Sequence, residues 1–506
     1  MNRIAARAAA VFAIALTFMA VVRSAALLDD TYITLRTVDN WVNGYGLRWN
    51  IVERVQSYTH PLWLFLLASV YLFTHEPYYT TLAVCFVVTL AALVLLVFAL
   101  PRSPWMGAAG ALALGASHAF VGFAGGGLEN PLSALLLVVL VLQLGRERTP
   151  RRLGWLGFTS ALLILTRPDF ALLVAPLLAV ELGSLRSGAA LRALALGLAP
   201  LFAWELFSFV YYGALVPNTA PAKLHHHVPK PMVLEQGRAW LLYTVRYDWA
   251  TALVVLWAAL VALWKRERWQ LACVAGALAY LFYFYRIGGD YSAGRLWMAP
   301  MVLALAVVVR SSSAVAAAGL LPIVLSTFWL GVRPVALGGD PSAGLPGTRG
   351  VWDDHAFYFP HTSLMKLGLH AKGPLIDWGH WGESEGHTPG RTLVFRAVGQ
   401  FGYFAGPSMH IIDDLALCDP LLSHLSPSND GFLVPGHLGR AIPAGYIEAA
   451  RGAHTPNALQ NASLREYFGN VVEITRGPIW SWSRLVKAFY WSTGQYEYLI
   501  RRYERR

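Results

Sequence analysis

The sequence predicts a polytopic α-helical membrane protein. Of its 506 residues, 56% are hydrophobic and only 14% are charged, whereas a soluble protein devotes about a quarter of its residues to charge. Long apolar runs alternate with short basic stretches, which is typical of membrane-spanning helices and their loops. This composition excludes a disordered protein, and three cysteines are too few for a disulfide scaffold. The net charge of +11 therefore indicates orientation in a bilayer, and we expect no nucleic-acid partner.

Twelve apolar segments approach the roughly 20 residues that a membrane crossing needs. From about residue 333 no such run occurs, and Gly, Pro, Asp and His become frequent. We therefore expect a transmembrane domain over residues 1–332 and a soluble C-terminal domain of mixed α/β structure over residues 333–506. The apolar segments are 8–28, 61–74, 80–100, 104–121, 131–145, 154–168, 170–184, 191–212, 249–264, 269–285, 296–310 and 312–332.

Basic residues indicate which of these segments cross, because Lys and Arg collect in cytoplasmic loops. If all twelve segments crossed, the basic clusters would lie on both sides of the membrane. Treating the short segment 61–74, which follows His60, as a helix on the outer surface places the clusters on one side. We therefore expect about eleven transmembrane helices, a cytoplasmic N-terminus and an extracytoplasmic C-terminal domain. The clusters are Arg3/Arg7, Arg102, Arg146/Arg148/Arg151/Arg152, Arg186/Arg192, Lys265/Arg266/Arg268 and Arg310.

An acidic pair, Asp29-Asp30, stands where the first apolar segment ends. Two adjacent carboxylates at an apolar boundary are costly. Repulsion and partial burial raise the pKa of at least one of them, which suits a general base or a metal ligand. On spacing alone, a stop signal for the first span is an equally good interpretation.

The residues around this pair follow an order that resembles a known family. The resemblance is to the GT-C superfamily of polyprenyl-phosphate-dependent glycosyltransferases, and within it to the mycobacterial and corynebacterial terminal β-(1→2)-arabinofuranosyltransferase family. It rests on Leu28-Asp29-Asp30-Thr31-Tyr32, Ile33-Thr34-Leu35-Arg36, Asn43-Gly44-Tyr45-Gly46-Leu47 and Glu53-Arg54-Val55-Gln56-Ser57-Tyr58-Thr59-His60-Pro61-Leu62-Trp63. Further stretches follow in order: Gly127-Leu128-Glu129-Asn130, Thr166-Arg167-Pro168-Asp169, Tyr212-Gly213, Pro217-Asn218-Thr219, Gly288-Gly289-Asp290 with Arg295, Asp419-Pro420-Leu421-Leu422, Gly436-His437 and Pro443-Ala444-Gly445-Tyr446.

The resemblance implies transfer of arabinofuranose on the outer face of the bacterial inner membrane. The lipid-linked donor would be decaprenyl-phosphoryl-arabinofuranose, and the acceptor glycan a cell-wall arabinan of arabinogalactan or lipoarabinomannan. We favour Asp29 as the base of an inverting displacement, with Asp30 orienting it or binding a divalent cation; the two roles can also be exchanged. The expected substrate-binding residues of the first loop are Tyr32, Arg36, Gln56 and His60.

Charged residues beyond the first loop are further candidates for substrate binding. Glu129 follows three glycines and is as well explained as an ordinary loop carboxylate. Arg167 and Asp169 flank Pro168, where a structural ion pair is the more favoured interpretation. Lys223, Arg286 and Arg295 suit a donor phosphate, although such residues often only reach the membrane interface. We favour Arg295 and Lys223, with Asp290 close to Arg295 in the sequence.

Two other features carry less weight. The tract His225-His226-His227 is better explained as a solvated loop than as a metal site, because consecutive side chains point in different directions. The run Trp352-Asp353-Asp354-His355 and the aromatic residues of the tail favour packing over ligand binding. No nucleotide-binding motif or zinc spacing is present in the sequence.

Three other functions compete with this one. A related GT-C enzyme would transfer another polyprenyl-phosphate sugar to a pilin, a lipopolysaccharide or another glycan. A transporter or lipid flippase would place charges at mid-span, often in related repeats, but Arg23 and Glu205 are among few such charges and no repeat is visible. A non-catalytic scaffold would tolerate substitution of both Asp29 and Asp30.

Overall fold

The structure is a computed structural model. The chain forms two compact units, and each unit is assembled from three stretches of sequence. The first unit comprises Met1–Leu28, Tyr78–Leu201 and Val233–Pro374. The second unit comprises Asp29–Pro77, Phe202–Met232 and Leu375–Arg506. The structure describes residues 3–224, 228–311, 313–327, 335, 347, 350–369, 373–386, 388, 390–428, 434–451 and 456–505.

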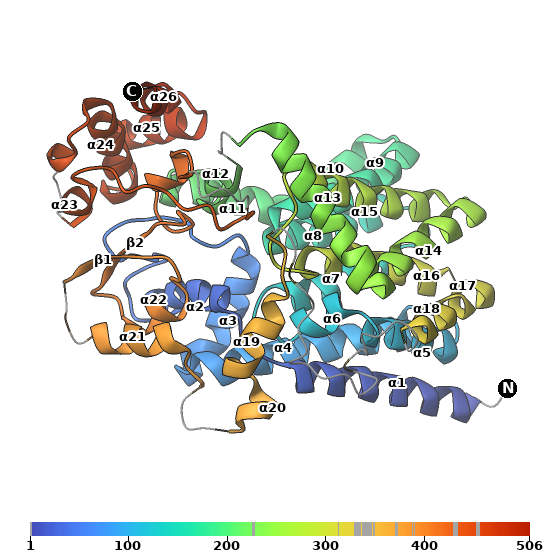
Figure 1. The fold of residues 1–506 in the computed structure, drawn as a ribbon. Helices are drawn as coiled ribbons and strands as arrows, with labels where there is room; N and C mark the ends of the chain where they lie inside the picture. The colour runs from blue at the N-terminus through green and yellow to red at the C-terminus, as the bar shows by residue number, and fades with distance from the viewer. Residues whose placement is uncertain are drawn as a thin grey trace. The chain divides into compact units, whose positions relative to one another are not determined.

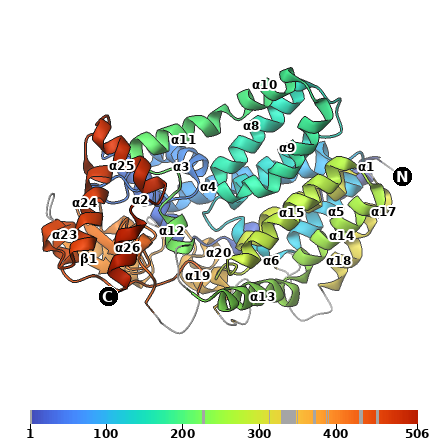
Figure 2. The same ribbon diagram turned by 90° about the horizontal axis from the view of Figure 1, so that it is seen from above.

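The first unit is a bundle of apolar helices. Within it α1 packs along α5, α8 packs on α9 and α10, α9 packs on α15, and α16 packs on α7 and α14 (Figures 1 and 2). Its elements are α1 (Arg3–Ser24), α4 (Pro77–Val94), η1 (Leu95–Ala99), α5 (Pro104–Gly115), α6 (His118–Phe123), α7 (Asn130–Leu142), α8 (Pro150–Thr166), η2 (Pro168–Phe170), α9 (Ala171–Leu185), α10 (Gly188–Gly197), α13 (Lys230–Tyr247), α14 (Trp249–Lys265), α15 (Arg268–Arg286), η3 (Arg295–Trp297), α16 (Met298–Arg310), α17 (Ala314–Ala318), α18 (Leu320–Ser326), α19 (Asp354–Thr362) and α20 (Leu364–Leu367).

The helices confirm the predicted helical class, and their apolar character is consistent with a membrane protein. Each of the twelve predicted segments falls on one helix or on consecutive helices, as far as its residues are described. Among the described residues, α1, α4 with η1, and η2 with α9 are long and apolar enough to cross a membrane. If each of two bent pairs, α10 with α11 (Ala199–Tyr212) and α13 with α14, is counted as one crossing, the number among the described residues rises to five. The count of eleven stays a prediction, because helices such as α7, with 13 residues, are short for a crossing.

Helix α13 lies in residues 213–248, which the sequence suggested as an outer loop. Its apolar residues are interrupted by Glu235, Gln236 and Arg238, so no long apolar run marks it. The packing explains why it is nevertheless a helix in the fold. Trp240 is completely buried, and a side chain at Gly237 would collide with the backbone oxygen of Tyr285 on α15. Tertiary contacts thus stabilise a helix that the hydropathy pattern does not show.

The second unit is built around a hydrophobic core that combines all three of its stretches. Ile33 and Trp49 come from the first stretch and Ala222 from the second. They pack with residues of the third, including Phe401 and Leu421. The elements of this unit are α2 (Asp29–Val42), α3 (Pro61–Thr74), α11 from residue 202 onward, α12 (Thr219–Leu224), α21 (Asp377–Glu385), β1 (Thr392–Phe395), α22 (Gln400–Phe404), β2 (His410–Asp413), η5 (Leu422–His424), α23 (Tyr446–Arg451), η6 (Pro456–Ala458), α24 (Ala462–Arg476), α25 (Trp482–Ser492) and α26 (Glu497–Glu504).

The C-terminal stretch contains helices and one small sheet. Strands β1 and β2 are parallel, with Thr392 opposite His410 and Phe395 opposite Asp413. The predicted mixed α/β domain is therefore represented, among the described residues, by a two-stranded sheet and not by a larger one. The predicted boundary at residues 332 and 333 lies outside the described residues, and the domain division stays a prediction.

Candidate active site

Asp29 begins helix α2 and its carboxylate is held by three N–H groups. Oδ1 accepts hydrogen bonds from Trp378 Nε1 at 2.8 Å and from the backbone N of Gln400 at 2.7 Å, and Oδ2 accepts one from the backbone N of Gly399 at 3.1 Å. The side chain is buried. Burial raises the pKa of Asp29 to about 6, with a smaller contribution from the charge of Asp30, although the three donors oppose the rise.

Asp30 has different surroundings, because it is the next residue on the helix and therefore points about 100° away from Asp29. Its side chain is half-buried. Burial raises the pKa of the Cys418 thiol, and the charges of Asp413 and Asp30 add to this effect, which places Asp30 within electrostatic reach of Cys418. Thr34, one turn further along α2, contacts His60 Nε2 through its hydroxyl at 2.7 Å. Asp30 therefore lies on the same helix as Thr34, which contacts His60, one of the residues predicted to bind substrate.

Gln56 and His60 belong to the irregular segment between α2 and α3, and both are buried. Gln56 donates from Nε2 to the backbone oxygen of Tyr58 at 3.2 Å, and its Oε1 accepts from the hydroxyl of Ser208 at 3.1 Å. Tyr58 in turn makes a 2.7 Å hydroxyl contact with Tyr212 at the end of α11. Both predicted residues are therefore fixed in place by polar contacts within the second unit.

Tyr32 and Arg36 are also fixed in the interior of the second unit. The ring of Tyr32 lies 5.7 Å from that of Tyr403. Arg36 lies 4.5 Å above the ring of Trp49 and donates to three backbone carbonyls, those of Trp49, Gly402 and Met409. These contacts explain both residues as parts of the fold, and their predicted role in substrate binding stays a prediction.

Four of the predicted charged residues of the first unit come together. Arg167 binds Asp169 with two hydrogen bonds, of 3.0 and 2.6 Å, which confirms the expected ion pair. Arg167 also reaches Glu129 Oε1 at 2.8 Å, and Arg295 Nη2 lies 3.9 Å from the same oxygen. Glu129 is buried with 1% of its surface exposed. Arg167 thus bridges Asp169 and Glu129, and the role of Arg295 in binding a donor phosphate stays a prediction.

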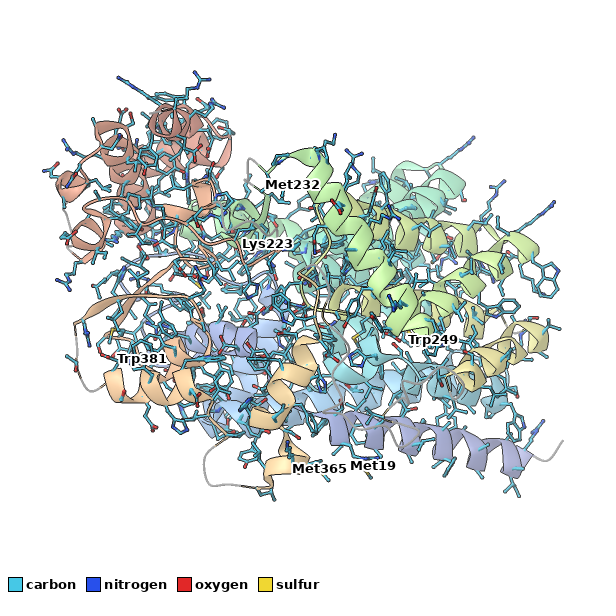
Figure 3. The ribbon with its side chains drawn as sticks, in the orientation of Figure 1. Met19, Lys223, Met232, Trp249, Met365 and Trp381 are labelled. Carbon is cyan, nitrogen blue, oxygen red and sulfur yellow. The ribbon has the colours of Figure 1, made fainter. Side chains whose placement is uncertain are left out.

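The remaining predicted residues are Asp290 and Lys223. Asp290 is buried in the loop between α15 and η3 and acts electrostatically on Tyr280 together with Asp169 and Glu129. Lys223 is exposed near the C-terminal end of α12 (Figure 3). The tract 225–227 lies outside the described residues.

The second unit contains a cavity of about 560 Å³, which is within the usual size range of ligand pockets. Its walls are mostly apolar, with Gln56, His424 and Glu497 among the polar groups; His424 Nδ1 lies 2.7 Å from Glu497 Oε1. The lining residues are Arg54, Val55, Gln56, Tyr212, Ala214, Leu215, Val216, Asn218, Ala220, Pro221, Leu224, His424, Trp491, Ser492, Gly494 and Glu497.

The chain was compared with known protein families and with curated proteins. No protein-family model matches the chain. A terminal β-(1→2)-arabinofuranosyltransferase of Mycobacterium tuberculosis (strain ATCC 25618 / H37Rv) is 27% identical over 504 residues, covering 79% of this chain and 78% of that protein. The chain is similar to arabinofuranosyltransferases. A protein of the same name from Corynebacterium glutamicum is 28% identical over 333 residues, covering 54% of this chain and 46% of its own length. The predicted closeness to these arabinofuranosyltransferases is confirmed.

The residues around Asp29 and Asp30 do not form a cation site of the usual kind. Asp29 already accepts three N–H donors, whereas a carboxylate that binds a divalent cation turns its lone pairs to the metal. Among the described residues, no group of three or more His, Cys, Asp and Glu side chains is arranged to hold a metal ion. The binding of a divalent cation by Asp30 stays a prediction.

The first unit contains a buried polar cluster whose contacts the sequence did not predict. His118 Nε2 lies 3.1 Å from Asp353 Oδ2, and Asp353 also caps α19 by accepting from the N of Ala356. Asp248 accepts from the backbone N of His118 at 3.1 Å. His355 Nε2 lies 3.0 Å from the hydroxyl of Ser24. From the sequence, the run from Trp352 to His355 is expected to serve in packing. The contacts of Asp353 with His118 and of His355 with Ser24 connect it to segments more than 200 residues away. A single sequence carries no signal of such long-range pairs.

Proposed function

We propose that this chain is an integral-membrane, inverting glycosyltransferase. It transfers arabinofuranose from decaprenyl-phosphoryl-arabinofuranose to the terminal residues of a cell-wall arabinan, of arabinogalactan or lipoarabinomannan, on the outer face of the inner membrane. The observation that carries the proposal is the similarity to the mycobacterial arabinofuranosyltransferase over 79% of the chain. Two carboxylates at the start of α2, in contrasting surroundings, supply the groups that the chemistry requires.

In this reaction the acceptor hydroxyl oxygen forms a bond to the anomeric carbon of arabinofuranose. The bond between that carbon and the phosphate oxygen breaks, its electron pair stays with the oxygen, and polyprenyl phosphate leaves. The proton of the hydroxyl passes to a carboxylate. Such a step needs one base, and the phosphate needs neutralisation of charge more than a strong acid.

We assign the base to Asp30 and the positioning role to Asp29, the reverse of the assignment that the sequence favoured. Three N–H groups occupy both oxygens of Asp29 and hold its ionised form. Asp30 is half-buried and lies on the helix that carries the contact between Thr34 and His60. For the donor phosphate we propose the exposed Lys223, which belongs to the same unit as Asp30.

The test is to incubate the purified full chain in lipid nanodiscs with a lipid donor and a synthetic arabinofuranoside acceptor. Separate reactions receive decaprenyl-phosphoryl-arabinofuranose or a polyprenyl-phosphoryl hexose. We expect a pentose-extended acceptor with the first donor and no product with the second. Transfer only from the hexose donor would replace the proposed sugar. Movement of intact donor across a liposome membrane without any product would instead indicate a flippase.

A further inference from the structure

The segment around α25 presents large apolar side chains to its surroundings. Trp480 is 81% exposed and Trp482 is 78% exposed, and Phe489 is 52% exposed. Trp482 and Phe489 are seven residues apart, about two turns, so they share one face of the helix. Soluble surfaces rarely gather several large apolar side chains in this way, and such a patch marks an interaction surface.

The opposite face of α25 fixes the helix to the end of α11. The buried Arg484 donates from Nη1 to the backbone oxygen of Val210 at 2.7 Å and from Nη2 to that of Tyr211 at 2.8 Å. Ser492 donates its hydroxyl to the backbone oxygen of Gly213 at 3.1 Å. A side chain at Gly213 would lie 3.2 Å from the methyl group of Ala488 on α25, so the two segments touch closely. The exposed aromatic face is therefore held at the C-terminal end of α11.

Helix α11 itself is apolar and exposes apolar side chains. Together with α10 it passes as a membrane crossing with a bend of 50°. Phe202 and Leu206, one turn apart on α11, are 59% and 66% exposed. The loop that follows α11 continues the apolar surface with Leu215 and Val216, both at least half exposed. The apolar surface thus continues from a helix of membrane type to the segment that carries Trp480 and Trp482.

We propose that Trp480, Trp482 and Phe489 form a docking surface for the interfacial layer of a lipid bilayer, at the level where α11 leaves the membrane. Tryptophan is the side chain most enriched at membrane–water interfaces, because its ring is apolar and its N–H is polar. The nearby Lys487 is paired with Glu473, so it adds no unpaired positive charge beside these aromatic side chains. Docking then depends on apolar burial more than on anionic lipids. This inference does not depend on the transferase reaction.

The cavity of the second unit lies next to the C-terminal end of α25. Trp491, Ser492 and Gly494, at and beyond the end of α25, line that cavity together with Leu215 and Val216. Docking of α25 on the bilayer would hold the cavity beside the headgroup layer. Substrates with a lipid chain reach a site at that depth without leaving the membrane.

The test uses spin labels on the full chain reconstituted in liposomes of phosphatidylcholine. Cysteines introduced by Trp482→Cys and Phe489→Cys carry the nitroxide; the native Cys85, Cys273 and Cys418 are buried. Trp381→Cys is the matched control, since Trp381 is 48% exposed and lies on α21 of the same unit (Figure 3). We expect the ratio of collisions with oxygen to collisions with a water-soluble nickel complex to be several-fold higher at 482 and 489 than at 381.

Two results would overturn the docking surface. Equal ratios at all three positions would show that α25 faces water. Protection of positions 482 and 489 from both reagents, lost when the protein is diluted into excess lipid, would show that a second copy of the chain covers the surface. Because the substituted side chains are exposed, retention of the folded state is checked by the thermal unfolding temperature of each labelled variant, which should match that of the parent.

Discussion

Asp29 and Asp30 are adjacent in sequence, yet their surroundings give them different chemistry. Asp29 is buried and accepts three N–H groups, so the fold holds it in one orientation. Asp30 is half-buried and is turned about 100° around α2. The first arrangement suits a residue that positions the start of α2, and the second suits a residue that exchanges a proton.

The raised pKa of Asp29 predicts an acidic limb in the activity. Burial raises this pKa to about 6, so the carboxyl becomes protonated below that pH and then competes with the N–H donors of Gly399 and Gln400. We expect kcat/KM of the wild type to fall as the pH drops through about 6. Asp29→Asn should lower kcat about 10- to 100-fold and remove this limb. An unchanged limb in Asp29→Asn would assign the titration to another group.

Arg36 gives a prediction that separates a structural role from substrate binding. Its guanidinium donates hydrogen bonds to three buried backbone carbonyls. The ammonium group of a lysine lacks the planar fork of donors and can form only some of these bonds. Arg36→Lys should therefore lower the free energy of unfolding by about 1–3 kcal/mol, measured by denaturant or thermal unfolding. If Arg36 instead binds the substrate, KM rises in Arg36→Lys while the unfolding temperature stays that of the wild type.

At the scale of elements, the N-terminal ends of α2 and α22 pack directly against each other and form a junction. Gly399, before α22, lies against the backbone oxygen and the carboxyl of Asp29, where a side chain would collide. A methyl group there must displace the start of α2 or of α22. The junction therefore transmits a small change in one element to the carboxylates of the other.

Gly399→Ala tests this junction. We expect a loss of about 10- to 100-fold in kcat, because a shift of about 1 Å in a positioned group has that effect. Gly188→Ala is the control, since no atom lies within 4 Å of a side chain at that position, and it should keep full activity. Equal activities of the two variants would show that the contact with Asp29 does not matter.

The success of prediction from sequence differed among elements for physical reasons. The helix at residues 61–74 has the predicted bounds because Pro61 begins it and an apolar run fills it. Asp29 and Asp30 are candidate site residues because charge at an apolar boundary is visible in a single sequence. The partners of Asp29, which are Trp378, Gly399 and Gln400, lie 349 to 371 residues away, and such long-range pairs leave no local pattern.

For the whole molecule, buried carboxylates of the second unit predict how stability depends on pH. Burial raises the pKa of Asp413 and of Asp419 to about 7. The folded state thus binds more protons than the unfolded state between about pH 4 and 7, so the free energy of unfolding falls as the pH rises through this range. Thermal unfolding of the second unit should occur at a higher temperature at pH 5 than at pH 8, and Asp413→Asn should flatten the difference. A higher unfolding temperature at pH 8 would contradict these pKa values.

The predicted orientation in the membrane is tested at one position. Glu76 follows α3, the helix placed on the outer membrane surface, so a cysteine introduced by Glu76→Cys should react with an impermeant maleimide on intact cells. A cysteine at Arg148, in a basic cluster expected on the inside, is the control and should react only after the cells are opened. Reaction of both, or of position 148 alone, in intact cells would contradict the predicted topology.

The most direct test of the central claim is the rate of arabinofuranosyl transfer by three purified proteins. Wild type, Asp30→Asn and Asp377→Asn are compared with decaprenyl-phosphoryl-arabinofuranose and a synthetic arabinofuranoside, and product is quantified by mass spectrometry. Asp377 is an exposed carboxylate on α21. Wild type and Asp377→Asn should form product at equal rates, and Asp30→Asn should be slower by about 10²- to 10⁴-fold. Undiminished transfer by Asp30→Asn, or no transfer by the wild type, would contradict the account.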